Sequence, residues 1–281
     1  MTNEFEIPQE YIDQINSTLS DGEIELPFFA PVLWWNNGAP MHKGQGGVQY
    51  YGGWAMSAED MDAAPQGILP GCKAETWTNR QGNEYSVYAT RMIGFAPVAK
   101  RRRWIVNDNG HGRSHVQILG MLATLPGKDQ AYVPWGPVVL SGKGYAGTRI
   151  EDALKDFDSG IREARLQHAP AVPPYFFFAF IGTHGKDPTV EQVGKTNKSP
   201  ITPCKALLPA TVSKEHLLAW FVGPALAPQM AEMAEQAQDW LDAWKEDNGN
   251  SKKAQPDNSY QDDELEAAWR TGETPPDEPP W

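Results

Sequence analysis

The sequence predicts a mainly β protein of the α+β class, built as a small β-barrel or β-sandwich with a few flanking helices. Short apolar or aromatic runs recur through the first half of the chain, separated by turn signals. Gly (26) and Pro (24) are both frequent in the 281 residues, which favours many short strands over a helical bundle. With 40% hydrophobic residues, the chain can form a substantial core.

Six runs between residues 24 and 145 are typical of strands. They are Pro31–Trp35, Gly47–Tyr51, Glu84–Tyr88, Arg103–Val106, His115–Leu119 and Pro137–Leu140. Turn sequences such as Asn36-Asn37-Gly38 and Gly52-Gly53 separate them. The regular spacing predicts a barrel or sandwich in this half of the chain.

The second half of the chain contains helical periodicity. The pattern predicts helices over Thr148–Leu166, after Ser213, and over Pro228–Lys245, with a short additional one over Pro8–Leu19 near the N-terminus. The wholly apolar run Tyr175–Ile181 is typical of a central strand buried on both faces. Ala206–Leu208 can add a last strand.

Composition changes after Trp244, and we expect two parts: a β-rich body over residues 1–245 and a disordered acidic tail over residues 246–281. Residues 91–149 hold nine Lys/Arg against two Asp/Glu, whereas the tail holds three against ten, within a net charge of −12. One basic segment thus lies inside an acidic chain, which indicates an anionic partner at that segment.

The tail ends Asp277-Glu278-Pro279-Pro280-Trp281. A terminal aromatic ring can fill an apolar pocket, while the prolines limit the entropy lost on docking and a basic rim holds the carboxylates. An acidic, disordered tail that ends in Pro and an aromatic residue resembles the C-terminal tip of bacterial and phage single-stranded-DNA-binding proteins, where the final residue is Phe. The resemblance covers about the last 20 residues and implies that these five residues recruit replication and recombination proteins. The alternative is a tail that only confers solubility.

The densest positive run is Lys100-Arg101-Arg102-Arg103-Trp104. In a strand, Arg101 and Arg103 share one face while Lys100, Arg102 and Trp104 share the other. Cations beside aromatic rings can hold phosphates while bases stack, which is how single strands are bound without sequence readout. The candidate nucleic-acid-binding residues are Arg91, Lys100, Arg101, Arg102, Arg103, Trp104, Arg113, Lys143, Trp34, Trp35, Trp54 and Trp135.

Each of these features also has a structural interpretation. Any single Trp is more often a core residue, and a run of cations can be a sheet edge protected against aggregation. Carboxylate pairs such as Glu59-Asp60 and Glu151-Asp152 are typical of helix starts. We predict no catalytic residue, metal site or cofactor, because His111 and His115 lie in a turn and a strand-like run instead of on one helix face, and the two cysteines stand 132 residues apart.

Together these observations predict a sequence-independent single-stranded-DNA-binding protein of replication, recombination and repair, and not an enzyme. By analogy, an oligonucleotide-binding barrel, elaborated or duplicated, is the expected fold. We expect a cytoplasmic location because the first 20 residues lack a signal peptide and no apolar run is long enough to cross a membrane. The choice between DNA and RNA, self-association, and an origin in a phage or a cell stay open. The alternative function is a Trp-rich β-sandwich that binds a carbohydrate or other ligand, or a phage structural protein. A third hypothesis is an enzyme of nucleic-acid metabolism whose active site is assembled from scattered residues.

Overall fold

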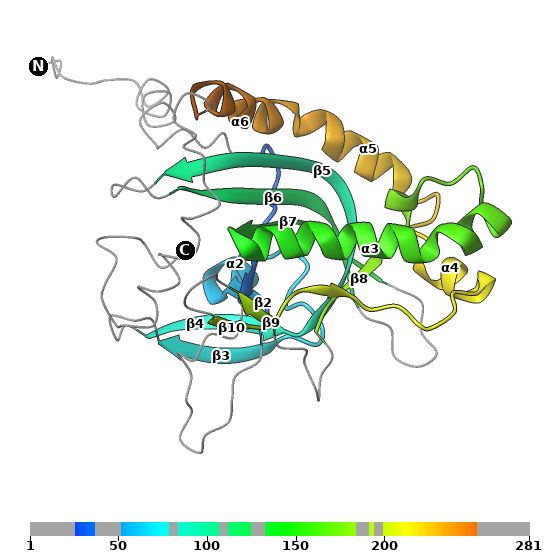
Figure 1. The fold of residues 1–281 in the computed structure, drawn as a ribbon, viewed down its shortest axis with the longest axis horizontal. Coiled ribbons are helices and arrows are strands. Elements are labelled where there is room, and N and C mark those ends of the chain that lie inside the picture. Colours follow the sequence, from blue (N-terminus) through cyan, green and yellow to red (C-terminus); the bar gives the residue numbers. More distant parts are fainter. Residues whose placement is uncertain are drawn as a thin grey trace, which may run out of the picture.

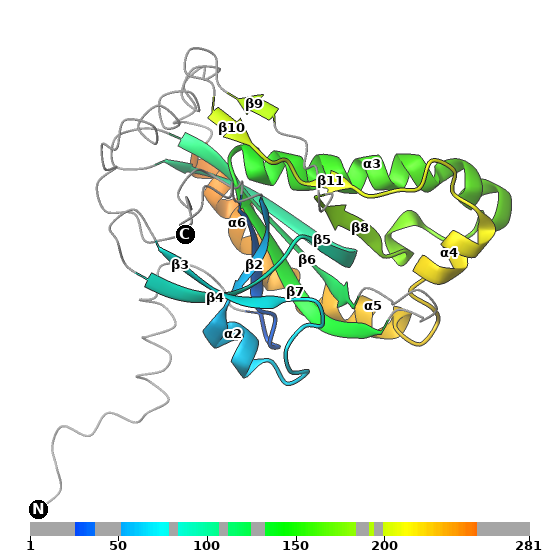
Figure 2. The same ribbon diagram turned by 90° about the horizontal axis from the view of Figure 1, so that it is seen from below.

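The computed structural model describes residues 26–36, 52–78, 84–106, 112–124, 133–183, 191–193 and 199–251. Nine strands form one mixed sheet in the order β11-β8-β5-β6-β7-β1-β2-β4-β3, and helices pack on both of its faces (Figures 1 and 2). The predicted helix Pro8–Leu19, the predicted strand Gly47–Tyr51 and the tail from residue 252 onward lie outside the described residues.

The strands of the sheet are β1 (Val32–Asn36), β2 (Gly53–Ser57), β3 (Lys73–Thr78), β4 (Glu84–Thr90), β5 (Met92–Val106), β6 (Gly112–Ala123), β7 (Pro134–Lys143), β8 (Ala179–Gly182) and β11 (Lys205–Ala206). A separate pair is formed by β9 (Glu191–Val193) and β10 (Ser199–Ile201). The helices are α2 (Ala58–Ala63), α3 (Tyr145–His168), α4 (Lys214–Trp220), α5 (Ala227–Gln236) and α6 (Gln238–Ser251), with a 3-10 turn at Pro174–Phe176. Within the described ranges, no helix is long and apolar enough to cross a membrane.

The sheet is strongly curled. Strands β4 and β5 are joined by Arg91 alone, although β6, β7, β1 and β2 stand between them in the sheet order. The sheet must therefore bend until the end of β4 meets the start of β5. Side chains also bridge the gap, since the indole Nε1 of Trp54 on β2 donates to the Ile181 carbonyl of β8 at 3.2 Å.

The described strands do not close into a barrel, because β11 and β3 end the sheet without pairing to each other. The expected oligonucleotide-binding barrel is therefore not confirmed, whereas the mainly β composition with a few flanking helices is. The neighbouring strands pair antiparallel except for β1 and β7, which pair parallel. This parallel pair makes the sheet mixed.

The sheet separates two cores. The face inside the curl, here called the α3 face, packs large residues such as Trp54, Phe95 and Ile118 against α3, including Phe157 and Ile161. The opposite face, here called the α6 face, packs against α5 and α6. Figure 1 shows α5 and α6 running over β5 and β6 on the side away from α3.

A β-bulge interrupts the long strand β5. Pro97 pairs with Gly120 and Ala99 pairs with Leu119, so that Val98 is an extra residue with no partner of its own on β6. As a result Ala96 and Ala99, three residues apart, both pack into the core of the α6 face. From Ala99 onward, the odd-numbered residues of β5 face α6.

Several predicted elements are confirmed, and others are corrected. Helix α3 covers the predicted Thr148–Leu166, and Ser213 caps α4 as expected. The run Tyr175–Ile181 is not a central strand, because Pro174 starts a 3-10 turn and only Ala179–Gly182 enters the sheet, next to the short edge strand β11. The last predicted helix is divided between α5 and α6, and α6 continues six residues beyond the expected boundary at Lys245.

Candidate nucleic-acid interface

Basic residues from four elements gather at one end of the sheet. The C-terminal end of β5, the start of β6, the end of β7 and the start of α3 meet there, because β6 pairs antiparallel with both β5 and β7. Arg103 pairs with His115, which in turn pairs with Lys143. The cations fall into two groups, one on each face of the sheet, as strand alternation predicts.

The first group lies on the α3 face. The Lys100 ammonium lies 3.0 Å from Oε1 of Glu151 on α3, and the Arg102 guanidinium contacts Oε2 of the same carboxylate. Glu151 is only 6% exposed, while the side chains of Lys100 and Arg102 are 53% and 50% exposed. One buried carboxylate thus anchors two cations whose charged side chains remain accessible to solvent.

This contact corrects the sequence-based interpretation of Glu151. The residue does not belong to a helix start, because α3 begins at Tyr145, well before it. Its carboxylate is instead the buried counterion of the basic strand. Glu59 and Asp60 do lie in the first turn of α2, as predicted for such a pair.

The second group lies on the α6 face and is covered by two indole rings. The Arg101 guanidinium carbon lies 3.7 Å from the ring centroid of Trp240 and 4.2 Å from that of Trp244. Its nitrogens donate to Oε1 of Gln117 at 2.6 and 2.9 Å and to the Trp240 carbonyl at 2.8 Å. Arg103 lies 4.6 Å from the Trp244 centroid. Arg101 is 5% exposed, so it fastens α6 to the sheet and does not present its charge to a phosphate.

His115 is buried at the centre of this group. Its Nε2 lies 2.9 Å from Oγ of Ser141, and its ring lies 5.0 Å from that of Trp244. Burial lowers the pKa of His115 to about 3, with further contributions from Lys143, Arg103, Arg101 and Arg113. Arg103 and Lys143 pair with His115 from the neighbouring strands β5 and β7, so cations stand on both sides of this residue in the sheet.

The Ser141–His115 pair has the residue types of a hydrolytic dyad, but its electrostatics are unfavourable for that chemistry. An imidazole with a pKa of about 3 is neutral at pH 7 and is a weak general base. Nδ1 of His115 has no hydrogen-bond partner in the described part of the chain, so no carboxylate orients the ring there. The pair is therefore explained as a buried polar contact.

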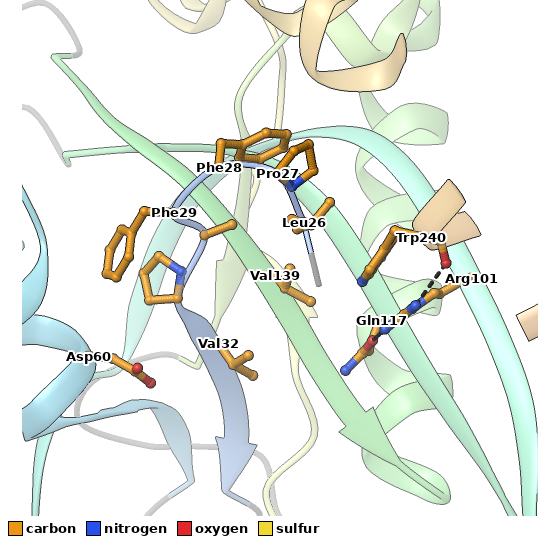
Figure 3. A pocket seen from close by; sticks show the side chains of 12 residues that line it. Leu26, Pro27, Phe28, Phe29, Val32, Asp60, Arg101, Gln117, Val139 and Trp240 are labelled. Atoms are coloured by element: carbon orange, nitrogen blue, oxygen red, sulfur yellow. Dashed lines mark hydrogen bonds between the residues drawn. The ribbon is translucent and has the colours of Figure 1, made fainter. Parts of the chain in front are cut away.

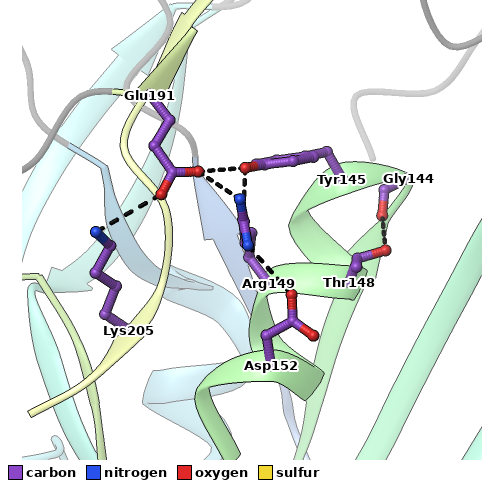
Figure 4. Close-up of polar contacts among 7 residues, drawn as sticks. All are labelled: Gly144, Tyr145, Thr148, Arg149, Asp152, Glu191 and Lys205. Atoms are coloured by element: carbon purple, nitrogen blue, oxygen red, sulfur yellow. Dashed lines mark hydrogen bonds and ion pairs between the residues drawn. The ribbon is translucent and has the colours of Figure 1, made fainter. Parts of the chain in front are cut away.

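A further polar cluster lies at the start of α3 (Figure 4). Arg149 bridges Asp152 at 3.2 Å and Glu191 of β9 at 2.6 Å, and Lys205 lies 3.6 Å from the other oxygen of Glu191. The Tyr145 hydroxyl donates to Glu191, and burial together with this hydrogen bond raises the pKa of Tyr145 to about 12. The cluster joins β9 and β11 to α3 and places a neutral phenol beside the cations.

The structure brings most of the predicted cationic residues together. Lys100, Arg101, Arg102, Arg103, Trp104, Arg113 and Lys143 all lie at this end of the sheet. Trp34 of β1 is close by, in register with Ser141. The Trp104 ring is half-buried and lies over Gly112, where a Cβ atom would stand 2.1 Å from its Nε1.

Four of the predicted site residues lie elsewhere. Arg91 is at the opposite end of β5, in the corner between β4 and β5. Trp35, Trp54 and Trp135 are 5%, 0% and 5% exposed, and their indole nitrogens donate to carbonyls of Thr202, Ile181 and Gly67. Because their rings are enclosed by the core, they offer no surface on which a base could stack. The predicted partner-binding residues 277–281 lie outside the described residues.

Sequence reasoning did not identify the roles of four residues of this region. Gln117 and Glu151 carry no pattern that distinguishes them from other polar residues of a strand and a helix. Trp240 and Trp244 are four residues apart and share a helix face, which predicted core packing. Their position over Arg101 depends on the pairing of distant elements.

A pocket of about 600 Å³ opens beside Arg101 on the α6 face (Figure 3). It is lined by Leu26, Pro27, Phe28, Phe29, Ala30, Pro31, Val32, Asp60, Arg101, Gln117, Val139 and Trp240. The segment that precedes β1 forms its apolar rim, α2 supplies Asp60 on one side, and Arg101, Gln117 and Trp240 stand on the other. This volume lies within the range of small-ligand pockets.

Within the described ranges, no group of three or more His, Cys, Asp or Glu side chains is arranged to hold a metal ion. Comparison of the chain with protein-family models, with curated proteins and with solved structures finds no match.

Proposed function

We propose that the protein binds single-stranded nucleic acid, and that it does so as a binding protein and not as an enzyme. The observation that carries the proposal is the gathering of the partly exposed Arg103, Arg113 and Lys143 around His115 on the α6 face, with the half-exposed Lys100 and Arg102 on the α3 face of β5. A local excess of cations attracts a polyanion even when the whole chain is acidic.

In this proposal the accessible cations follow the phosphates across the end of the sheet. Lys100 and Arg102 are half exposed, and Arg103, Arg113 and Lys143 are partly exposed. The partly exposed rings of Trp34 and Trp104 are the candidates for base stacking in this region. Because phosphates and ring faces are common to all nucleotides, binding through them is largely independent of sequence.

The acidic tail has a proposed role of its own. Its carboxylates would compete with nucleic acid for the same cations, and residues 277–281 would recruit proteins of replication or recombination.

The test is binding of a fluorescent dT oligonucleotide at several salt concentrations. The full chain is compared with a chain ending at Ser251, where α6 ends, because a cut at Lys245 would remove the last turns of the helix that carries Trp244. We expect affinity to fall with salt with a log–log slope of about −0.7 per phosphate contacted, and to rise when the tail is removed. Absence of binding at low salt by both chains would reject the proposal.

A second candidate function is binding of a neutral carbohydrate or similar ligand. The pocket beside Arg101 favours it, because aromatic walls and a few polar groups also suit a sugar. Binding of a neutral ligand should hardly respond to salt, so the same titration separates the two functions.

A further inference from the structure

Gln117 directs a hydrogen-bond donor into the pocket beside Arg101. An arginine side chain has only donors, and two nitrogens of Arg101 donate to the same Gln117 oxygen. The amide oxygen must therefore face Arg101, and the amide NH₂ must face away from it. Figure 3 shows the Gln117 nitrogen on the pocket side.

The position of this amide is fixed by its surroundings. Gln117 is 7% exposed, and Arg101, which holds its oxygen, is 5% exposed and lies between two indole rings. The donor is thus preorganised, since binding a ligand would not require the side chain to be ordered first. A ligand that fits here presents an acceptor, such as a carbonyl oxygen, to Gln117.

The walls of the pocket suit a flat, uncharged ring. Phe28, Phe29 and Trp240 line it together with aliphatic side chains, and Phe29 is 40% exposed at its rim. The Asp60 carboxylate on the opposite side disfavours a phosphate inside the pocket and can accept a hydrogen bond from a ring N–H. The ring would therefore enter the pocket while its charged substituent stays outside.

The cations continue from the pocket along the sheet. Arg103 follows Arg101 on the same face of β5, about 6.6 Å further at 3.3 Å per residue. Lys143 lies level with Arg103 across β6, and Arg113 lies two residue pairs further on. A strand whose phosphates lie on these cations can place one of its bases at the pocket entrance.

We propose that the pocket is a base-binding subsite, which takes one unstacked nucleobase with a ring carbonyl, such as thymine or uracil, and pairs that carbonyl with the Gln117 amide. The inference rests on the proposed function and adds a base preference at one position of the bound strand. Adenine can accept from Gln117 at a ring nitrogen, but it has no ring N–H to donate to Asp60 on the opposite wall, so we expect it to bind this subsite less well than thymine or uracil.

The test uses the full chain and abasic oligonucleotides that carry a single thymine, a single adenine or no base. Gln117→Glu keeps the size of the side chain and an oxygen for Arg101 but replaces the donor by an acceptor. In the unmodified chain, we expect the oligonucleotide with a single thymine to bind about ten-fold more tightly than the fully abasic one. It should also bind more tightly than the oligonucleotide with a single adenine, by a smaller factor. Gln117→Glu should remove both preferences. Its extra negative charge weakens all three oligonucleotides alike and cancels in the ratios.

Phe29→Ala provides a second variant that leaves Arg101 untouched. Phe29 is 40% exposed at the pocket rim, so the substitution should lower the thymine preference without a large loss of stability. Phe221→Ala is the matched control, because Phe221 is 37% exposed and stands against Phe177, not in the pocket.

The outcomes distinguish this inference from the proposed function. Salt-dependent binding with no thymine preference, or with a preference that both Gln117→Glu and Phe29→Ala leave unchanged, would overturn the subsite and leave the proposed function in place. Failure of all three oligonucleotides to bind would overturn both. Calorimetric titration with thymidine and with a neutral disaccharide adds a direct measurement, in which a response to the disaccharide alone would assign the pocket to a sugar instead.

Discussion

The two faces of the basic strand β5 carry the same kind of residue and use it differently. On the α6 face, Arg101 is enclosed by Trp240, Trp244 and Gln117 and is 5% exposed. On the α3 face, Lys100 and Arg102 share the buried carboxylate of Glu151 but keep about half of their side-chain surface in solvent.

This difference shows that a run of cations in a sequence is not a single functional unit. Alternation along a strand sends neighbouring cations to opposite environments. A cation stacked between indoles stabilises the fold, whereas a cation with an exposed head is available to a phosphate. Substitutions on the two faces should therefore separate stability from binding.

The largest expected effect is on the enclosed face. Arg101→Met keeps much of the apolar stem but removes hydrogen bonds to a charged group, worth about 1.5–3 kcal/mol, and the cation–π contacts, worth about 2 kcal/mol when desolvated. We expect the free energy of unfolding in urea to fall by roughly 3 kcal/mol. Unchanged stability with a large loss of oligonucleotide affinity would mean that Arg101 is a binding residue, and the comparison between the faces would fail.

Measuring the free energy of unfolding as a function of pH tests the α6 face without substituting a cation. The pKa of His115 is about 3 in the folded protein, below its ordinary 6.5, so the unfolded chain takes up the proton first. Stability should be constant above pH 6.5 and should fall below it, by about 1.4 kcal/mol per pH unit at the steepest. The interval from pH 6.5 to 5 is the informative one, because most carboxylates titrate lower. In His115→Gln this part of the pH dependence should disappear; if it persists, another group is responsible.

The exposed face calls for a triple substitution. Lys100→Ala with Arg102→Ala alone would leave the Glu151 carboxylate buried without its counterions, so Glu151→Gln is added to keep the site uncharged. We expect unfolding to change little, while the log–log salt slope of dT binding becomes shallower by about 1.4, equivalent to two lost phosphate contacts. A slope equal to that of the unmodified chain would exclude these two residues from the interface.

The smallest expected effect comes from Glu151→Gln on its own. Without the carboxylate, Lys100 and Arg102 lose their competitor for phosphate, so oligonucleotide affinity at low salt should rise a few-fold, with a steeper salt slope. Glu235→Gln, at an exposed position of α5 on the opposite face of the sheet, removes the same charge away from these two cations and serves as the control. An equal rise in both variants would indicate only the change in net charge.

Much of the fold was accessible from local patterns. The strands around Trp34, Val87, Val116 and Val138 and the long helix α3 follow from apolar periodicity and turn residues, and the division of Lys100–Arg103 between two faces follows from alternation. These features depend on residues that are close in the sequence, so the local residue pattern is enough to predict them.

The rest depends on contacts between distant segments. The curl of the sheet follows from the Arg91 corner together with the order of nine strands, and this order buries Trp35 and Trp54. The partners Glu151 and Trp240 reach β5 from helices that lie far along the chain. No local pattern shows which helix covers which face of a sheet.

The bulge at Val98 has a consequence for how this surface can change. Side chains alternate with a period of two, so the extra residue sets the phase of everything that follows it on β5. Deleting Val98 would leave Pro97 and Ala99 paired with Gly120 and Leu119 as successive residues of a regular strand, so Arg101 and Arg103 would still face α6 and Lys100 and Arg102 would still face α3. The bulge thus allows the strand to lose one residue at this point without exchanging its two charge surfaces, whereas loss of a residue within the regular pairing that follows Ala99 would exchange them.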